Sequence, residues 1–166
     1  MKPSDKRQVR FERLVKTWTK DVFRYAFWLC GDQHIAEELV QETFTRVWKY
    51  LDQLSDDNAA KSWLFTIVKR ENARRYERYC PEIETLDHDQ IAANGDYDTS
   101  TEAFVLRQAL AKLPDEYREP LILQVIAGYS IKEIALQMDL STGAVMTRVH
   151  RARQKLRDTL QGTENK

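Results

Sequence analysis

The sequence predicts an all-α protein made of two small helical domains joined by a flexible acidic linker. The chain has only 5 Gly and 4 Pro in 166 residues, too few turn formers for a fold of many short strands. Residues 81–100 read PEIETLDHDQIAANGDYDTS, an acidic stretch without helical periodicity. The stretches on either side carry apolar residues at helical spacing. We therefore expect a first domain at 8–80, the linker at 81–100 and a second domain at 101–160.

The first domain contains three long helical patterns. The first pattern covers residues 8–30 and stops at Gly31, a residue suited to a helix C-terminus. The second covers residues 34–51. The third covers residues 58–79, and Pro81 prevents its continuation.

The second domain begins with two helical patterns separated by a proline. Residues 101–112 form the first pattern, and Pro114 suits the first turn of the next helix. That helix covers residues 115–127 and ends at Gly128. Pro120 lies inside it and should kink it at a cost of about 3 kcal/mol.

Residues 129–157 carry the pattern of a helix-turn-helix. Ser130 and Glu133 form the capping-box sequence S-x-x-E, which opens a short helix. Residues 139–141 make a tight connection, and a second helix starts near Thr142. Two helices joined by about three residues are typical of a helix-turn-helix.

The second of these helices has an apolar face and a polar face. The apolar arc is formed by Val145, Val149, Ala152 and Leu156. The opposite side carries Thr147, His150, Arg151 and Gln154, flanked by Met146 and by several arginines. Cations that hold phosphates and polar groups that reach base edges are what a DNA-reading helix needs. A solvated basic helix is the alternative interpretation.

Two aromatic residues lie off the apolar stripe of the helix at 34–51. Phe44 and Trp48 are four residues apart and sit beside acidic and amide side chains. Large aromatic residues on the rim of an acidic helix suggest a protein-binding surface. Coverage by another helix of the same domain explains them equally well.

The helix at 58–79 changes character at Lys69. Its apolar stripe, which includes Trp63 and Ile67, runs into the basic sequence KRENARRYERY. Arginines with neighbouring aromatic and amide groups suit single-stranded DNA, where bases are unstacked. A frayed and solvated helix end is the competing interpretation.

Composition excludes several classes of protein. Lys and Arg number 26, as do Asp and Glu, and no stretch approaches the roughly 20 apolar residues of a membrane span. The basic N-terminal segment lacks the apolar core of a secretory signal, so we expect a cytoplasmic protein. Cys30 and Cys80 do not make a disulfide framework, although a thiol switch is conceivable. The histidines lack ligand spacing and no phosphate loop is present, so we expect no enzyme activity, catalytic residue, metal or cofactor.

Taken together, the motifs resemble one family. HIAEELVQETFTRVWKYL is similar to region 2.2 of bacterial RNA polymerase sigma factors of the small extracytoplasmic-function (ECF, group IV) type. SWLFTIVKRENARRYER resembles regions 2.3 and 2.4, and the stretch from ALAKLPDEYREP to RVHRARQKL resembles region 4. The resemblance covers roughly residues 8–160.

The resemblance implies a role for each of three residue groups. The β′ clamp helices of core polymerase would be contacted by Leu39, Gln41, Glu42, Phe44 and Trp48. The −10 promoter element would be melted and captured by Trp63, Lys69, Arg70, Asn72, Arg74 and Arg75. The −35 duplex would be read by Met146, Thr147, Arg148, His150 and Arg151. Further implied partners are the β flap of polymerase and an anti-sigma factor.

Two positions depart from the family pattern. Arg70 stands where many relatives carry Asn, and Met146 stands where relatives often carry Arg or Lys. At Met146, one expected −35 contact would either be lost or become an apolar contact with a thymine methyl group. The alternative function is a helix-turn-helix regulator that acts without polymerase, which would leave Phe44, Trp48 and the basic helix without a role.

Overall fold

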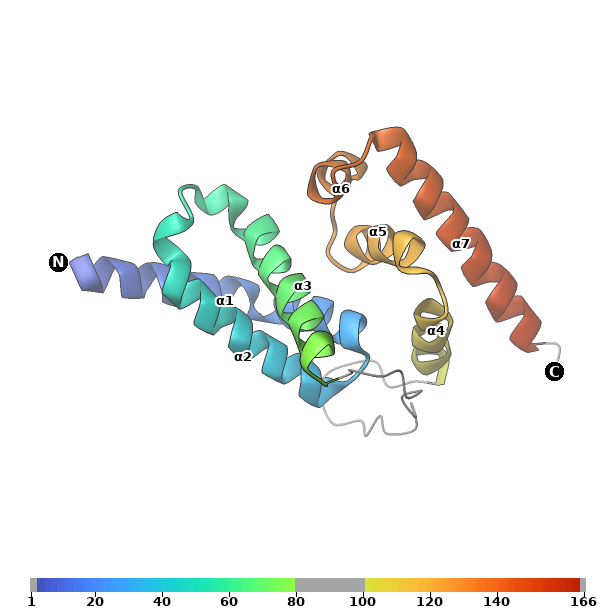
Figure 1. Ribbon diagram of the computed structural model, residues 1–166, viewed down its shortest axis with the longest axis horizontal. Coiled ribbons are helices and arrows are strands. Elements are labelled where there is room, and N and C mark those ends of the chain that lie inside the picture. The colour runs from blue at the N-terminus through green and yellow to red at the C-terminus, as the bar shows by residue number, and fades with distance from the viewer. Residues whose placement is uncertain (1–2, 80–100, 165–166) are drawn as a thin grey trace. The chain divides into compact units, whose positions relative to one another are not determined.

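The computed structural model describes the backbone of residues 3–79 and 101–164 and the side chains of 5–78 and 101–162 (Figure 1). All regular elements within these residues are helical, as predicted. No helix among them is both long and apolar enough to cross a membrane. The chain divides into two compact units, Met1–Ile91 and Ala92–Lys166. The predicted linker lies outside the described residues, so its flexibility stays a prediction.

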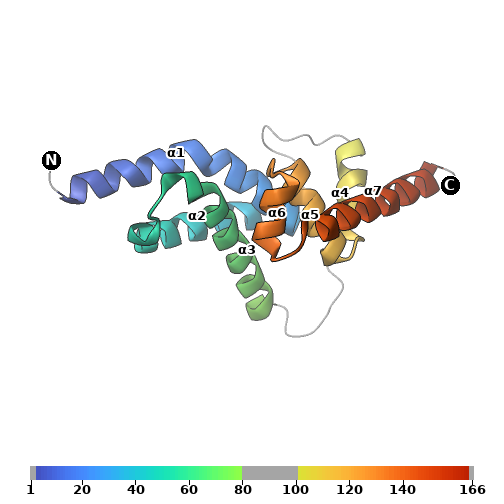
Figure 2. The same ribbon diagram turned by 90° about the horizontal axis from the view of Figure 1, so that it is seen from above.

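Three helices that contact one another build the first unit (Figures 1 and 2). They are α1 (Pro3–Cys30), α2 (Gln33–Tyr50) and α3 (Ala60–Tyr79), and the short 3₁₀ turns η1 (Leu51–Gln53) and η2 (Asp57–Ala59) connect α2 to α3. The core between them is formed by fully buried side chains that include Val22, Tyr25, Val47, Leu64 and Phe65. The sequence periodicity therefore identified the three helices.

The junction between α1 and α2 shows why each helix ends where it does. Gly31 has φ +70°, a left-handed conformation that glycine adopts without steric cost. Its amide donates to the carbonyl of Phe27 at 2.7 Å and closes α1, which confirms the predicted end. Asp32 then caps α2, because its carboxylate accepts the amide of Ile35 at 2.8 Å.

Arginines of α1 hold the connection between α2 and α3. Arg10 donates to Oδ1 of Asp57 from Nε at 2.9 Å and from a terminal nitrogen at 2.7 Å. The same guanidinium reaches the carbonyl of Leu54 at 2.5 Å, and Arg13 pairs with Asp57 as well. The hydrogen bond from Arg10 holds the pKa of Asp57 below its ordinary range. Part of the basic N-terminal segment is therefore used inside the domain.

Within its described residues, the second unit consists of four helices, namely α4 (Thr101–Ala111), α5 (Asp115–Val125), α6 (Ile131–Met138) and α7 (Thr142–Glu164). The helix α5 continues through Pro120, whose ring is buried, and ends at Val125. The helix was expected to run to residue 127 and to end at Gly128, but it ends two residues earlier, and Gly128, with φ +68°, lies in the connection to α6. Helices α5 and α6 both pack on α7, and the core includes Leu121, Ile122, Leu123 and Ile134.

The turn between α6 and α7 is a compact helix-turn-helix connection (Figure 2). Ser130 and Glu133 make the predicted capping box in both directions, with the Ser130 amide donating to Glu133 at 2.7 Å. Asp139 ends α6 with φ +53°, a left-handed conformation that Asp tolerates better than most residues. Ser141 then accepts the amide of Ala144 at 3.1 Å and opens α7. The helix-turn-helix prediction is confirmed.

The charge on Asp57 should stabilise the first unit. A carboxylate with a depressed pKa adds stability above its unfolded pKa, and this stability is lost as the pH falls through the folded value. Asp57→Asn should therefore lower the urea midpoint at pH 7, and the difference from the parent chain should shrink below about pH 4. Asp158→Asn, at an exposed position of α7, is the matched control. An Asp57→Asn deficit that is equal at pH 7 and pH 3 would contradict the ion-pair interpretation.

The capping box should contribute measurably to the second unit. Ser130→Ala removes the acceptor for the Glu133 amide, and loss of an N-cap side chain costs about 1 kcal/mol. Urea unfolding followed by circular dichroism should show this loss in the transition of the second unit. Ser55→Ala, at an exposed serine between η1 and η2, should leave the curve unchanged.

Candidate functional site

The outward face of α7 presents most of the residues predicted for −35 recognition. Met146 is 61% exposed, and Thr147, His150 and Arg151 are exposed as well. Arg148 is half-buried at the edge of this face. The opposite side is core, because Val145, Val149 and Ala152 are buried as the periodicity predicts. The five residues thus lie within six positions at the start of one helix, next to the turn.

Two other cations of α7 serve the fold of the second unit. Arg153 donates to Oε1 of Gln124 on α5 at 2.8 Å. The Lys155 ammonium lies 5.9 Å from the centre of the Tyr117 ring, also on α5. Both cations remain exposed while they contact α5, so part of the basic character of α7 also serves the packing of the second unit.

Helix α1 covers part of the aromatic rim of α2. Phe44 is buried, and Phe11 of α1 packs edge-on against it at 6.4 Å between ring centres. The same Phe11 ring lies 5.1 Å from Trp48, and the guanidinium of Arg7 lies 5.1 Å over the Trp48 ring. Trp48 nevertheless remains 44% exposed. Coverage by a helix of the same domain thus explains Phe44, whereas Trp48 keeps a solvent-facing edge.

The predicted polymerase-contact group therefore divides between core and surface. Leu39, like Phe44, is buried in the core of the three helices, and the contact of these two residues with polymerase stays a prediction. Gln41 and Glu42 are exposed together with Trp48. The available surface of α2 is an acidic and amide-bearing face with one aromatic edge.

Side chains of α3 and α2 line a cleft of about 240 Å³ on one side of α3. Its lining residues are Arg46, Tyr50, Gln53, Trp63, Ile67, Arg70, Glu71 and Arg74. Three residues predicted for the −10 element, Trp63, Arg70 and Arg74, meet here. Aromatic and guanidinium groups around one opening are suited to a nucleotide, which offers a flat base and a negative phosphate.

The other residues predicted for the −10 element lie outside this cleft. Lys69, which directly precedes Arg70 on α3, is exposed. The Oδ1 atom of Asn72 is buried and has no hydrogen-bond partner among the described residues. Asn72 is thus turned toward the protein, and its predicted contact with DNA remains untested.

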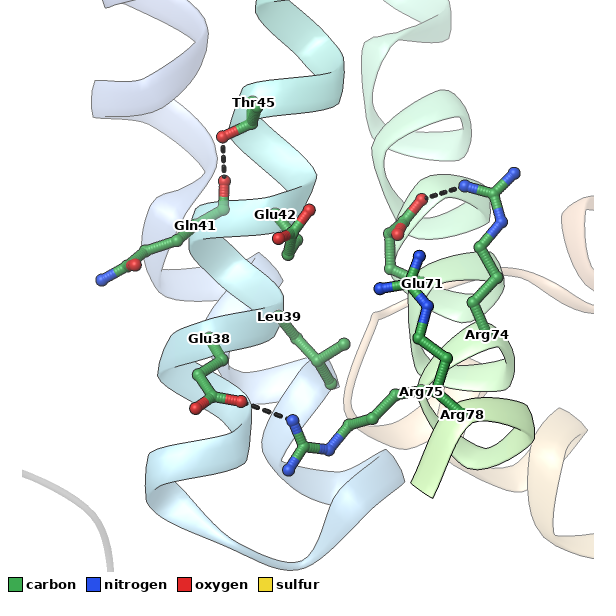
Figure 3. A pocket seen from close by; sticks show the side chains of 9 residues that line it. All are labelled: Glu38, Leu39, Gln41, Glu42, Thr45, Glu71, Arg74, Arg75 and Arg78. Atoms are coloured by element: carbon green, nitrogen blue, oxygen red, sulfur yellow. Dashed lines mark hydrogen bonds and ion pairs between the residues drawn. The ribbon is translucent and has the colours of Figure 1, made fainter. Parts of the chain in front are cut away.

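A second and more polar groove of about 340 Å³ lies between α2 and α3 (Figure 3). Arg75 reaches across it to pair with Glu38 of α2. Arg74 turns to Glu71 within α3, at 2.6 Å. The lining also includes Leu39, Gln41 and Glu42, so residues predicted for polymerase contact and residues predicted for DNA contact share one groove.

Sequence reasoning missed Glu71 and Arg46. Glu71 is buried in the middle of the basic sequence, and Nε of Arg46 on α2 lies 3.2 Å from its Oε1 atom. The only local signal was a Glu three positions before Arg74 in a run of cations. The pairing with Arg46 involves a different helix, so the spacing of residues along the sequence does not indicate it.

Burial makes Cys30 a poor candidate for a thiol switch. Loss of solvation raises the pKa of its thiol to about 11, so the reactive thiolate is scarce at neutral pH. The Sγ atom donates to the carbonyl of Asp32 at 3.3 Å. Cys80 lies outside the described residues.

Comparison with known proteins identifies the family. Residues 14–79 match sigma-70 region 2, and residues 103–156 match sigma-70, region 4. The ECF RNA polymerase sigma factor SigL of Mycobacterium tuberculosis is 30% identical over 146 residues, which cover 84% of this chain and 82% of SigL. The chain belongs to the ECF sigma factors of the sigma-70 family. Helices α1–α3 thus correspond to region 2, and α4–α7 correspond to region 4.

Two further proteins bear out the similarity to ECF sigma factors. SigE of Mycolicibacterium smegmatis is 35% identical over 158 residues, which cover 90% of this chain, and the match spans 61% of the length of SigE. The structure of CnrH in complex with the cytosolic domain of CnrY has a TM-score of 0.71 and 27% identity. It covers 93% of this chain and 90% of CnrH.

Proposed function

We propose that this ECF sigma factor binds core RNA polymerase and directs promoter-specific initiation of transcription. One observation carries the proposal: a single chain joins an exposed helix-turn-helix face to a basic, aromatic cleft beside a helix with an exposed tryptophan. The two modules match regions 2 and 4 of the family. A factor of this kind acts by binding in the cytoplasm, without catalysis of its own.

The −35 element would be read as duplex by α7. An α-helix fits the major groove, and residues near the start of a recognition helix reach the base edges. Thr147 donates its hydroxyl to the carbonyl of Gly143 at 3.0 Å, so both lone pairs of the hydroxyl oxygen remain available as acceptors. Arg148 and Arg151 suit guanine or phosphate, and Met146 suits a thymine methyl group.

The −10 element would be captured as single strand by α3. Arg70 and Arg74 flank the cleft that contains Trp63. A base removed from the duplex loses its stacking partners, and aromatic and guanidinium planes replace part of that stacking. Lys69, Asn72 and Arg75 complete the predicted set.

Core polymerase would dock on the exposed face of α2. Gln41, Glu42 and Trp48 offer an acidic surface with an aromatic anchor, which suits the β′ clamp helices that the family resemblance implies. Region 4 would engage the β flap. Leu39 and Phe44 support this surface from the core.

Polymerase is needed because each module alone binds DNA weakly. The chain has no net charge, so general attraction to DNA is small. When both modules are held on one polymerase, the second contact becomes intramolecular and its effective concentration rises. An anti-sigma factor that covers these surfaces would keep the protein inactive. In support, the similar protein CnrH was solved with the cytosolic domain of CnrY bound.

Run-off transcription tests the function directly. The purified chain and core polymerase are incubated with fragmented genomic DNA, and the transcripts are sequenced. Transcripts that start at a shared upstream motif and require the chain are the expected result. A chain that binds duplex selectively but neither binds polymerase nor yields transcripts would instead be a helix-turn-helix regulator.

The basic residues of α3 should separate polymerase binding from promoter opening. In Arg74→Ala with Arg75→Ala, polymerase affinity should stay within about threefold, whereas opening should fall about tenfold or more because two phosphate contacts are lost. Permanganate footprinting of the −10 region measures opening. Thermal unfolding of the variant excludes collapse of the domain, since both arginines also pair with carboxylates. Equal loss of the two activities would refute the division of roles.

The exposed tryptophan of α2 should show the reverse behaviour. Trp48→Ala should weaken polymerase binding by about tenfold, because aromatic anchors dominate interface energy. Fluorescence titration with core polymerase gives the affinity. Val9→Ala, at a 56% exposed apolar position on α1, is the control. Unchanged affinity in Trp48→Ala would place the polymerase contact elsewhere.

A further inference from the structure

Glu71 is unusual among the charged residues that the structure describes. It is the only one of them that is buried, with 8% of its surface exposed. An unpaired buried carboxylate is strongly destabilising, so its retention requires compensating charge. The compensation comes from two arginines on two helices.

Both arginines use the same carboxylate oxygen. Nε of Arg46 on α2 lies 3.2 Å from Oε1 of Glu71, and a terminal nitrogen of Arg74 lies 2.6 Å from that atom. A guanidinium has five N–H donors, and these contacts use only a part of them. Arg46 and Arg74 remain 30% and 47% exposed, so each guanidinium is held from the protein side while part of it faces solvent.

The solvent-facing parts border the cleft that contains Trp63. Arg46, Arg70 and Arg74 all line it, and Glu71 is the one carboxylate in the lining. Three positive charges against one negative charge leave the opening positive. A carboxylate beneath the arginines fixes their positions without covering the opening.

We propose that Arg46 binds a backbone phosphate of the captured single strand beside Arg74, and that Glu71 is a positioning residue for both guanidiniums. The inference rests on the proposed function, since the ligand is the single-stranded −10 DNA. It extends the DNA-binding surface from α3 to α2, the helix to which the polymerase contact is assigned. Arg46 lies one helical turn after Glu42, so the two contacts would be neighbours on that helix.

The positioning role has a physical basis. A long side chain that is ordered only on binding loses rotamer freedom at that moment, and this loss weakens the complex. The ion pairs with Glu71 order both arginines in advance. A purely electrostatic view predicts the opposite sign for Glu71, because a negative charge near phosphate lowers DNA affinity.

The test uses holoenzyme assembled from core polymerase and the full chain. The probe is a fork-junction DNA with a single-stranded −10 region, taken from a promoter found by run-off transcription with the parent chain. Affinity is measured at several salt concentrations. Each phosphate contact to a single strand contributes about 0.7 to the slope of log K against log salt. Arg46→Gln should reduce the slope by about that amount, and Arg24→Gln, at an exposed arginine of α1, should not.

The Glu71→Gln variant distinguishes a positioning role of Glu71 from a purely electrostatic effect of its charge. The substitution makes the cleft more positive but removes the anchor, so we expect fork affinity to fall by about threefold to tenfold. The salt slope should not decrease, because no cation is lost. Tighter binding by Glu71→Gln, or an unchanged slope in Arg46→Gln, would overturn the proposal.

Two controls keep the result interpretable. Thermal unfolding and polymerase affinity are measured for every variant, and Arg46→Lys restores the charge if Arg46→Gln is unstable. Restoration of the parent slope by Lys supports the phosphate contact, and a slope that stays low refutes it. If the parent chain yields no promoter at all, the proposed function fails. If the parent opens promoters and Arg46→Gln matches Arg24→Gln, only the further inference fails.

Discussion

Compensation of one buried negative charge sets the arrangement of the region 2 surface. Glu71 is buried between α2 and α3, and Arg46 and Arg74 supply the compensating charge, because a buried carboxylate without a partner is destabilising. The ion pair between Arg46 and Glu71 therefore links α2 to α3 at the point where the surfaces with different predicted partners separate. The aromatic cleft opens on one side of this point, and the groove crossed by Arg75 opens on the other. Glu71 and Arg74 belong to the lining of both openings, so one ion-pair cluster borders the two.

The blocks of like charge along the sequence are explained by ion pairs within the first unit as well as by contacts with other molecules. The basic segment at 1–20 and the acidic segment at 31–60 meet in space, because Arg7 pairs with Asp52 at 3.1 Å and Arg10 pairs with Asp57. Exposed pairs of this kind contribute little stability individually. Their effect is to fix the connection between α2 and α3, and therefore the position at which α3 begins. Part of the charge in these two segments is thus paired within one domain.

The sequence was sufficient wherever local rules decide the outcome. Gly31, the capping box at Ser130 and the buried arc with Val145 follow from backbone conformation, hydrogen bonding and helical period. It was insufficient wherever residues far apart in sequence meet. A helical wheel of α2 places Phe44 on a rim, but only the packing of Phe11 from α1 shows that the rim is covered. The partnership of Arg46 with Glu71 spans 25 positions between two helices, and periodicity carries no information about such contacts.

Prior pairing of cations also bears on how promoter selectivity arises. A protein with 6–10 phosphate contacts loses about 10³–10⁵ in DNA affinity between 50 and 200 mM salt. Contacts between unpaired cations and phosphates therefore give strong binding that does not depend on the DNA sequence. Here Arg74 and Arg75 are already paired with carboxylates. Arg74 keeps donors that face solvent, so its ion pair orders the side chain without blocking phosphate, whereas Arg75 has to exchange its bond to Glu38 for a phosphate contact. On the proposed function, a neutral chain with paired arginines remains inactive on bulk DNA, and polymerase supplies the proximity that makes the competition favourable.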